Sequence, residues 1–417
     1  MMSQKSLIQN DVIELNNLNQ QNKDNIYNLP NFNPQIINQK YLDTLGVVVQ
    51  PDEITLKKLE MGSSAFIKQL QTRSLIPEPR LTEMDIPVET PLPVHNYTST
   101  GHCPGNILEL NPVQGCNVGC LYCLVTDGKH DQSLVAFKNY PKYVRSHLEA
   151  NKDKRYWYYL SAKTEAFQEP TLETGIVHNI LREFIQHYKK NPDSPARLYL
   201  VTKAGTKQLL FKHHGNSILD LLSEIPDRVQ YNPSIGLMPE TLRIILEPYA
   251  APIQERLDAV LLCQQVGIDS NSVLAQPIIG PYLSPETMSD YFSKIKSANI
   301  INYKPEFLTL CMENLAMIGQ IIGYFDRALE KSIYEQYIAH DNQNHRKQRE
   351  RTAPNKTFSY AKLMELKEVG ESFGLTMSVC FWVREQIDLA KDLPVINNNG
   401  FCCDFPLWNR FRVPNHT

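Results

Sequence analysis

The sequence lacks three features that would each place it in a broad class of protein. It has no run of about 18 apolar residues, which a membrane-spanning helix would need. It opens with no basic segment followed by an apolar stretch, so we expect no secretory leader. Its 42 lysines and arginines stand against 45 aspartates and glutamates, whereas nucleic-acid-binding domains are usually basic. We therefore expect a cytoplasmic protein that does not enter membranes and for which nucleic acid is an unexpected partner.

The nine cysteines show no paired spacing of the kind that marks a secreted disulfide framework. Three of them nevertheless lie together, as Cys116, Cys120 and Cys123 in a C-x3-C-x2-C run. Thiolates are ligands of iron–sulfur clusters, so this run could bind three irons of a [4Fe–4S] cluster. The fourth iron would have no local protein ligand. Ferredoxin-like runs supply four cysteines and serve electron transfer, so an open iron points to chemistry at the cluster instead.

Two other kinds of site could use such a run, and the sequence favours neither. A structural zinc ion normally takes four nitrogen or sulfur ligands, usually as two pairs, and no second pair lies nearby. A disulfide framework requires an oxidising compartment and a short chain, whereas this chain has 417 residues. We therefore predict an iron–sulfur cluster on the three cysteines.

From residue 106 onward, strand-like segments alternate with helix-like segments. The expected strands are 106–110, 156–160, 198–202, 228–234, 272–277, 307–311 and 376–381. The expected helices are 173–188, 217–222, 239–246, 253–266, 285–297 and 325–339. Such alternation predicts a parallel sheet covered by helices, and six units of this kind would make a partial (β/α)6 barrel of the α/β class. Active sites of parallel barrels lie at the carboxyl ends of the strands, and the cysteine run follows the first expected strand.

The rest of the chain divides into three further regions. We expect residues 1–40, which are rich in asparagine and glutamine, to be a flexible tail. Residues 41–105 are expected to form an N-terminal arm, with a helix over 53–71 and an extended part rich in proline. The barrel covers 106–312, and a C-terminal extension of helices and strand covers 313–417.

Two segments of the C-terminal extension have more than one interpretation. The basic segment 345–351 could be a solvated helix end or loop. It could instead be a binding site for an acidic peptide or a phosphate backbone. Cys402 and Cys403 lie among aromatic residues close to the end of the sequence. That tail could pack against the core or bring a thiol to the active site.

The cysteine spacing, with Tyr122 just before the last cysteine, resembles that of the radical S-adenosylmethionine (SAM) superfamily. The resemblance implies that the open iron chelates the amino and carboxylate groups of SAM, and that Tyr122 lies near the adenine. It also implies a reaction: one electron from the cluster cleaves SAM to a 5′-deoxyadenosyl radical, which abstracts a hydrogen atom. A small reductant such as flavodoxin or ferredoxin would supply the electron.

Further segments resemble the spore photoproduct lyase-like branch of that superfamily. They are 161–170, 201–205, 233–235, 247–257 with 266–268, and 276–281. The resemblance implies that Lys203 and Ser234 contact the SAM carboxylate and ribose, and a lysine suits a carboxylate because the hydrogen bond is charge-assisted.

The same resemblance assigns four more residues to the SAM site. Ser161 and Thr164 would lie at the amino-group side of SAM, and Glu165 could accept from the ammonium or the ribose. Pro277 would shape the strand end near the adenine. We expect Arg256, by contrast, to pair with Glu247 or to cap a helix rather than to touch substrate.

These residues identify a radical generator but not its target, and three targets remain open. The loop 108–116, the asparagine-rich start and the length resemble maturases of ribosomally made precursor peptides, most of all the spliceases. Spliceases excise a tyramine unit and leave an α-keto-β-amino acid, and they work with a small separate leader-binding partner.

The other two targets each require a thiol hydrogen donor near the radical. A peptide epimerase could use Cys311, Cys402 or Cys403, with Cys103 and Cys380 as further candidates. Cys311 and Cys380 could equally be small buried hydrophobic residues. DNA repair would also need a nucleic-acid groove; the net charge opposes it, and the basic segment 345–351 keeps it open.

Overall fold

The structure is a computed structural model. It describes residue 26 and residues 29–72, 80–86, 94–96, 107–123, 133–338 and 352–379. The candidate thiols Cys103, Cys380, Cys402 and Cys403 lie outside the described residues, and so does the basic segment 345–351. No helix in the described ranges is both long and apolar enough to cross a bilayer.

Most strands of the protein are parallel and belong to two sheets. The first sheet contains, in spatial order, β10 (Val229–Pro233), β7 (Arg197–Thr202), β6 (Trp157–Leu160), β3 (Ile107–Leu110) and β2 (Val94–Asn96), of which only β2 is antiparallel to its neighbour. The second contains β11 (Ser272–Ile278), β12 (Asn302–Phe307) and β13 (Thr376–Met377). Their residues are almost all buried, as expected for parallel strands covered on both faces.

Three isolated parallel bridges connect the two sheets. They join Gln230 to Asp269, Ser234 to Leu274 and Leu237 to Ile278. The strands β3, β6, β7, β10, β11 and β12 therefore follow one another side by side in chain order, and their carboxyl ends lie at the same edge. The α/β class with parallel sheets, predicted from the alternation, is confirmed.

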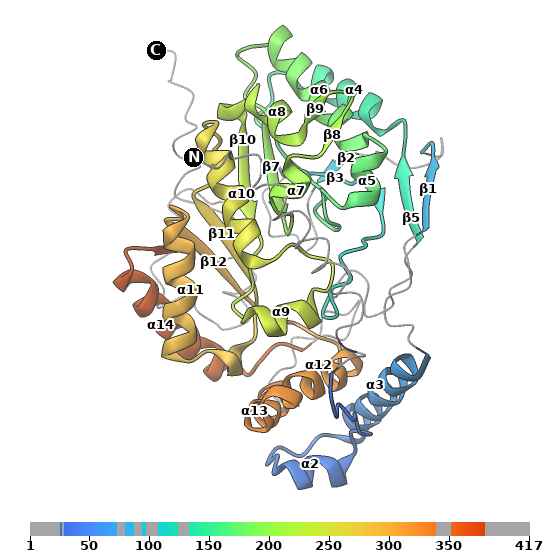
Figure 1. Ribbon diagram of the computed structural model, residues 1–417, viewed down its shortest axis with the longest axis vertical. Helices are drawn as coiled ribbons and strands as arrows, with labels where there is room; N and C mark the ends of the chain where they lie inside the picture. Colours follow the sequence, from blue (N-terminus) through green and yellow to red (C-terminus); the bar gives the residue numbers. More distant parts are fainter. Residues whose placement is uncertain are drawn as a thin grey trace, which may run out of the picture.

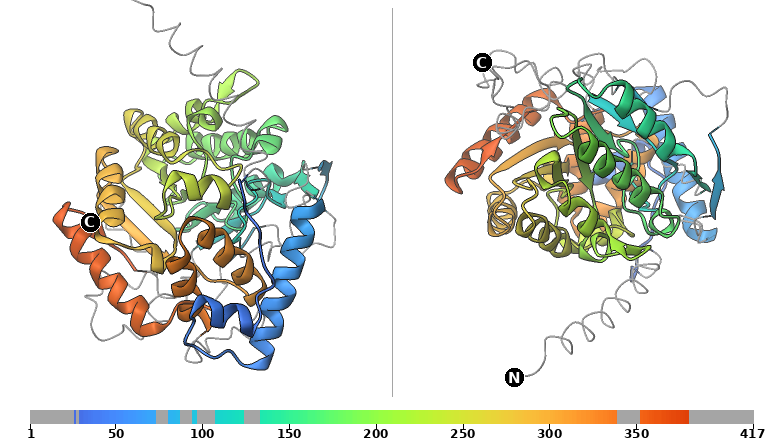
Figure 2. Two further views of the ribbon diagram at one scale, coloured as in Figure 1. Left: turned by 60° about the horizontal axis from the view of Figure 1, so that its bottom comes forward. Right: turned by 90° about the horizontal axis from the view of Figure 1, so that it is seen from above.

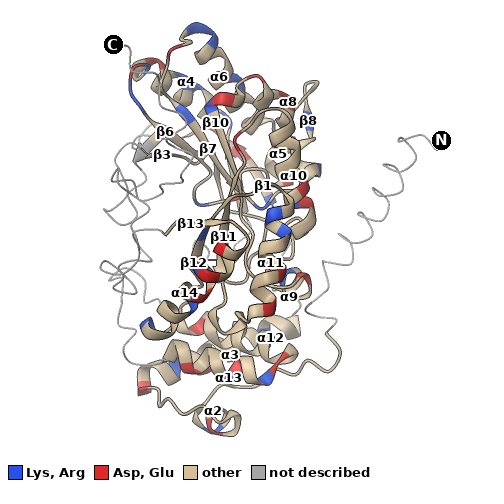
Figure 3. Ribbon diagram, turned by 90° about the vertical axis from the view of Figure 1, so that its left-hand side faces the viewer, with Lys and Arg blue, Asp and Glu red and all other residues tan. Residues whose placement is uncertain are grey.

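Helices follow the strands and cover the sheets (Figure 1). The helices of this layer are α4 (Tyr140–Ala150), α5 (Glu169–Glu173), α6 (Ile176–Lys190), α7 (Thr206–Leu209), α8 (Ile218–Ser223), α9 (Glu240–Leu246), α10 (Ile253–Gln265), α11 (Pro285–Ser297) and α14 (Lys356–Ser372), with 3-10 turns at Pro226–Arg228 and Gly280–Tyr282. In Figure 3 most charged residues lie on helices, whereas the strands are mostly tan. This distribution matches a sheet that is enclosed by amphipathic helices.

The described residues also form two small sheets. In one, β5 (Ser133–Phe137) lies between β1 (Arg80–Met84), to which it is parallel, and β4 (Val113–Gln114), to which it is antiparallel. The other is the hairpin of β8 (Lys212–His213) and β9 (Asn216–Ser217). Because β4 directly precedes the cysteine run, its pairing with β5 fixes the start of that loop.

A separate group of helices lies at one end of the molecule (Figures 1 and 2). It contains α2 (Gln39–Leu45), α3 (Glu53–Thr72), α12 (Met312–Phe325) and α13 (Arg327–Ile338). Helix α3 packs on α12 so closely that a Cβ atom at Gly62 would lie 2.3 Å from the carbonyl oxygen of Glu313. The helix predicted over 53–71 is thus confirmed, and its central glycine is required by this contact.

The second hydrophobic core of the protein joins this helical group to the cysteine loop. Its members include Leu59, Ile318 and Tyr334 from the helices together with Val118 and Leu121 from the loop. The last part of the predicted tail also belongs here, because Ile37 is fully buried and its backbone N–H donates to Ser63 Oγ at 3.0 Å.

Several elements of the structure were not expected, among them α2, α4 and β5. The strand expected at 307–311 lies instead at Asn302–Phe307, where polar residues alternate with apolar ones and all but Glu306 are buried. Residues 308–311 connect this strand to α12, and the apolar character of Leu308 and Leu310 is explained by their burial. Helices α12 and α14 were not expected; α12 is buried over most of its surface and so lacks the one-sided apolar stripe of a surface helix.

Candidate functional site

A cavity of about 260 Å³ lies at the carboxyl ends of the parallel strands. Its wall includes every residue that the sequence analysis assigned to the cluster or to SAM: Cys116, Cys120, Tyr122, Cys123, Ser161, Thr164, Glu165, Lys203, Ser234 and Pro277. These residues come from segments that are far apart in the sequence, and the fold brings them to one place. Cys311, the N-cap residue of α12, is not among the lining residues.

The cysteine loop is held by backbone contacts with two distant segments. The backbone N–H of Leu121 donates to Leu246 O at 2.9 Å, and that of Tyr249 donates to Val118 O at 3.2 Å. The side-chain oxygen of Gln168 accepts from the backbone N–H of Asn117 at 2.8 Å. Each of these bonds holds the backbone of the loop in place.

The turn into the cysteine loop depends on Gly115. Its φ angle is 82°, and a Cβ atom there would lie 2.6 Å from the carbonyl oxygen of Ser133. Any other residue would have to adopt this left-handed conformation and also displace β5.

Of the three cysteines of the loop, Cys120 is buried, whereas Cys116 and Cys123 are partly exposed. Cys116, Cys120 and Cys123 form no disulfide, and burial raises the pKa of Cys116 to about 12 and that of Cys120 well above its usual value. No three ligating side chains in the described ranges are arranged around a single metal ion. In a [4Fe–4S] cluster each thiolate binds a different iron, so the sulfur atoms need not converge on one point. In such a cluster, each of the three thiols of the loop could hold one iron.

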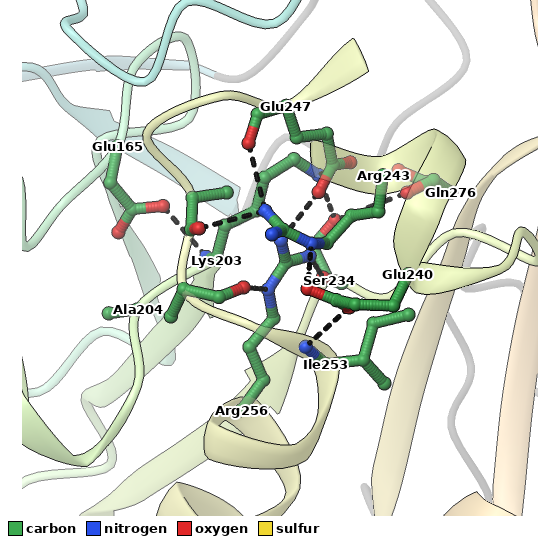
Figure 4. Close-up of polar contacts among 12 residues, drawn as sticks. Glu165, Lys203, Ala204, Ser234, Glu240, Arg243, Glu247, Ile253, Arg256 and Gln276 are labelled. Atoms are coloured by element: carbon green, nitrogen blue, oxygen red, sulfur yellow. Dashed lines mark hydrogen bonds and ion pairs between the residues drawn. The ribbon is translucent and has the colours of Figure 1, made fainter. Parts of the chain in front are cut away.

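A buried carboxylate, Glu247, organises the polar groups beside the loop (Figure 4). Arg256 Nη2 lies 2.5 Å from one of its oxygens, Lys203 Nζ lies 3.4 Å from the other, and the Tyr122 hydroxyl donates to the latter. Burial alone would raise the pKa of Glu247, but the charges of Arg256 and Lys203 lower it to about 2. The carboxylate thus stays ionised and holds both Tyr122 and Lys203 in position.

The guanidinium group of Arg256 bonds to three neighbouring groups of the protein. Besides Glu247 it donates to the backbone carbonyls of Ser234 at 2.8 Å and Ala251 at 2.7 Å. The predicted pairing of Arg256 with Glu247 is confirmed. Because Arg256 already compensates Glu247, Lys203 can direct its charge at a ligand. Lys203 Nζ also donates to Ser234 Oγ at 2.7 Å, and its side chain remains 16% exposed.

Glu165 has contacts that differ in kind from those of Lys203. Its oxygens accept from the Thr202 hydroxyl and from the backbone N–H groups of Phe167 at 3.0 Å and Lys203 at 2.7 Å. Glu165 therefore ties the loop after β6 to the end of β7. Thr164 Oγ1, by contrast, is buried with no hydrogen-bond partner in the described part of the chain. This unsatisfied hydroxyl is free to bond a ligand in the cavity.

The cavity also has lining residues that the sequence analysis missed, chief among them Tyr159, Gln276, Glu306 and Thr309. Gln276 stands directly before Pro277, so its position was within reach. Glu306 was missed because the strand that contains it, β12, was expected to begin at residue 307, five residues after its observed start.

Comparison with known proteins adds no relative. No protein-family model matches the sequence, and no curated protein is significantly similar to it. The functional argument therefore depends on the motif and on the residues gathered in the cavity.

Proposed function

We propose that the protein is a radical SAM enzyme, with a [4Fe–4S] cluster on Cys116, Cys120 and Cys123. One observation carries the proposal: all ten residues chosen from sequence resemblance line the same cavity. Residues selected by a chance match would be scattered over the molecule.

The proposal includes closure of the strands into a partial (β/α)6 barrel. Strands β6 and β12 are separated by β7, β10 and β11, so in a flat sheet they would lie about 19 Å apart at the usual strand spacing. Tyr159 of β6 and Glu306 of β12 nevertheless line one cavity. Curvature of the row of strands accounts for this proximity.

The chain's own residues have distinct roles in this site. When bound, the cluster and SAM supply a 5′-deoxyadenosyl radical after one-electron reduction by a flavodoxin or ferredoxin. Lys203 would bind the carboxylate of SAM, Ser234 its ribose, and the unsatisfied Thr164 hydroxyl its amino-group side. Tyr122, fixed by Glu247, would pack near the adenine. Lys203, Ser234 and Tyr122 are preorganised by protein contacts, which lowers the cost of orienting the cofactor.

For the substrate we propose the backbone of a ribosomally made precursor peptide, delivered by a small leader-binding partner. The reaction is excision of a tyramine unit to leave an α-keto-β-amino acid. Excision needs no thiol donor, and in the described ranges the only thiols lining the cavity are those of the cluster loop. Cys311, one candidate donor for epimerisation, is not among the lining residues, whereas Cys103, Cys380, Cys402 and Cys403 lie outside the described residues, so the choice of excision rests on the resemblance to the spliceases.

The proposal is tested by anaerobic reconstitution with iron and sulfide, followed by chromatography of 5′-deoxyadenosine. We expect its formation to require reductant and to vanish in Cys116→Ala, Cys120→Ala and Cys123→Ala. Cys263→Ala is the control, because Cys263 is a buried cysteine that lies in α10 and does not line the cavity. Unchanged formation in a loop variant would refute the proposal. Co-expression with a precursor peptide and mass spectrometry then tests for the loss of tyramine.

A further inference from the structure

Apart from Pro277, the cavity wall formed by β11 and β12 has no assigned role in cofactor binding. In β11 every residue is buried except Gln276, and in β12 every residue is buried except Glu306. Both exposed positions line the cavity. Each of these two buried strands therefore places one partly exposed polar side chain on the wall of the cavity.

Glu306 stands at the end of a row of hydrogen bonds that crosses four neighbouring strands. Lys203 Nζ donates to Ser234 Oγ at 2.7 Å, and Ser234 Oγ donates to the backbone carbonyl of Gln276 at 3.4 Å. The side-chain amide of Gln276 then donates to Glu306 Oε2 at 2.5 Å. Figure 4 shows the part of this row around Lys203, Ser234 and Gln276. A cation thus lies at the cofactor end of the row and a carboxylate at the far end.

The chemistry of this pair favours a ligand that donates hydrogen bonds. The side-chain amide of Gln276 orients the Glu306 carboxylate, whose two oxygens can also accept hydrogen bonds from a donor on a ligand, and charge-assisted bonds to a carboxylate are stronger than neutral ones. The backbone N–H of a peptide is such a donor. A phosphodiester has acceptor oxygens only and cannot donate a hydrogen bond to Glu306.

We propose that Glu306, oriented by Gln276, determines substrate specificity by accepting a hydrogen bond from a peptide backbone N–H. This inference rests on the proposed function and adds to it the residues that bind the substrate and the reason a peptide is chosen over a nucleic acid. Lys203 and Glu306 divide the cavity into a cofactor side and a substrate side.

The test uses the reconstituted full-length enzyme with SAM, reductant and a concentrated mixture of peptides prepared from perdeuterated protein, so that peptides reach the cavity without the leader-binding partner. The deuterated fraction of the 5′-deoxyadenosine reports hydrogen abstraction from peptide, and it is independent of the total amount formed. We expect a deuterated fraction in the wild type that falls at least 10-fold in Glu306→Gln and by a smaller factor in Gln276→Leu. Glu365→Gln, a substitution in α14 away from the cavity, serves as the control.

The other possible outcomes contradict the role of Glu306, the assignment of a peptide substrate or the proposed function. An unchanged deuterated fraction in Glu306→Gln contradicts the role of Glu306, and so does a complete loss of 5′-deoxyadenosine, which would assign Glu306 to the cofactor. A wild type that forms 5′-deoxyadenosine without deuterium from peptides, but with deuterium from a perdeuterated oligonucleotide or from neither probe, overturns the peptide assignment. A wild type that forms none refutes the proposed function itself.

Discussion

The cofactor side and the substrate side of the cavity differ in how completely the protein satisfies its own polar groups. On the cofactor side, Glu247 and Arg256 are fully buried and bonded to Tyr122, Lys203 and backbone carbonyls. On the substrate side, Gln276 and Glu306 are partly exposed and bonded to each other. A side that binds one constant cofactor can be built as a rigid framework, whereas a side that binds a specific substrate must keep polar groups accessible.

The largest effect that separates the two sides should come from the cluster loop. Cys120→Ala removes a proposed iron ligand, and we expect 5′-deoxyadenosine to fall below detection. Glu306→Gln should leave the iron content of the purified protein unchanged, because it lies on the other side of the cavity. Iron analysis and chromatography of 5′-deoxyadenosine compare the two variants. Equal loss of iron in both would contradict the proposed division of the cavity into a cofactor side and a substrate side.

The buried ion pair should dominate the stability of the cofactor side. Arg256→Met leaves Glu247 buried without its main counter-charge, which costs about 3–5 kcal/mol of unfolding free energy. Lys294→Met, which breaks an exposed pair with Asp290, should cost about 0–1 kcal/mol. Urea unfolding of the apoprotein measures both losses of unfolding free energy. Similar losses in the two variants would mean that the buried Arg256–Glu247 pair contributes no more to stability than an exposed pair.

Lys203 should affect cofactor affinity more than stability. Lys203→Met removes a charge-assisted bond worth about 1.5–3 kcal/mol, so we expect the Kd for SAM to rise about 10- to 100-fold. Equilibrium binding of radiolabelled SAM to the reconstituted protein gives the value. An unaltered Kd would show that Lys203 serves Glu247 alone.

A smaller effect is expected far from the cavity, at His178 in α6. Burial lowers the pKa of His178 from 6.5 to about 4. Between these values the unfolded chain binds a proton that the folded chain does not, so stability falls as pH falls from 6.5 towards 4. The contribution lost by pH 5 is about 2 kcal/mol.

His178→Gln is the comparison for that pH effect, because an amide can still donate to the carbonyl of Phe211, which His178 Nε2 contacts at 3.1 Å. Unfolding at pH 7 and pH 5 should show a smaller loss for the variant than for the wild type. Equal losses would place the acid sensitivity elsewhere.

The sequence predicted residues that the fold gathers in one cavity, because these residues belong to short local patterns. The cysteine run, Lys203 and Ser234 each stand at the end of a strand, where neighbouring residues already constrain them. The contact of Tyr122 with Glu247 joins residues 125 positions apart, and no local pattern encodes it.

The substrate side was predicted poorly for a related physical reason. Strand β12 carries the polar residues Asn302, Lys304 and Glu306 on alternate positions, so it does not look like a buried strand. Helix α12 is buried nearly all round and has no polar face to mark it. Both elements depend on tertiary burial that local propensity does not report.

The central claim is that three thiols hold a four-iron cluster with one iron open to SAM. Its most direct test is the electron paramagnetic resonance spectrum of the reduced, anaerobically reconstituted protein before and after addition of SAM. The account predicts a [4Fe–4S]⁺ signal that changes shape when SAM is added, and its absence in Cys120→Ala. A protein without that signal, or with a signal that SAM leaves unaltered, would contradict the account.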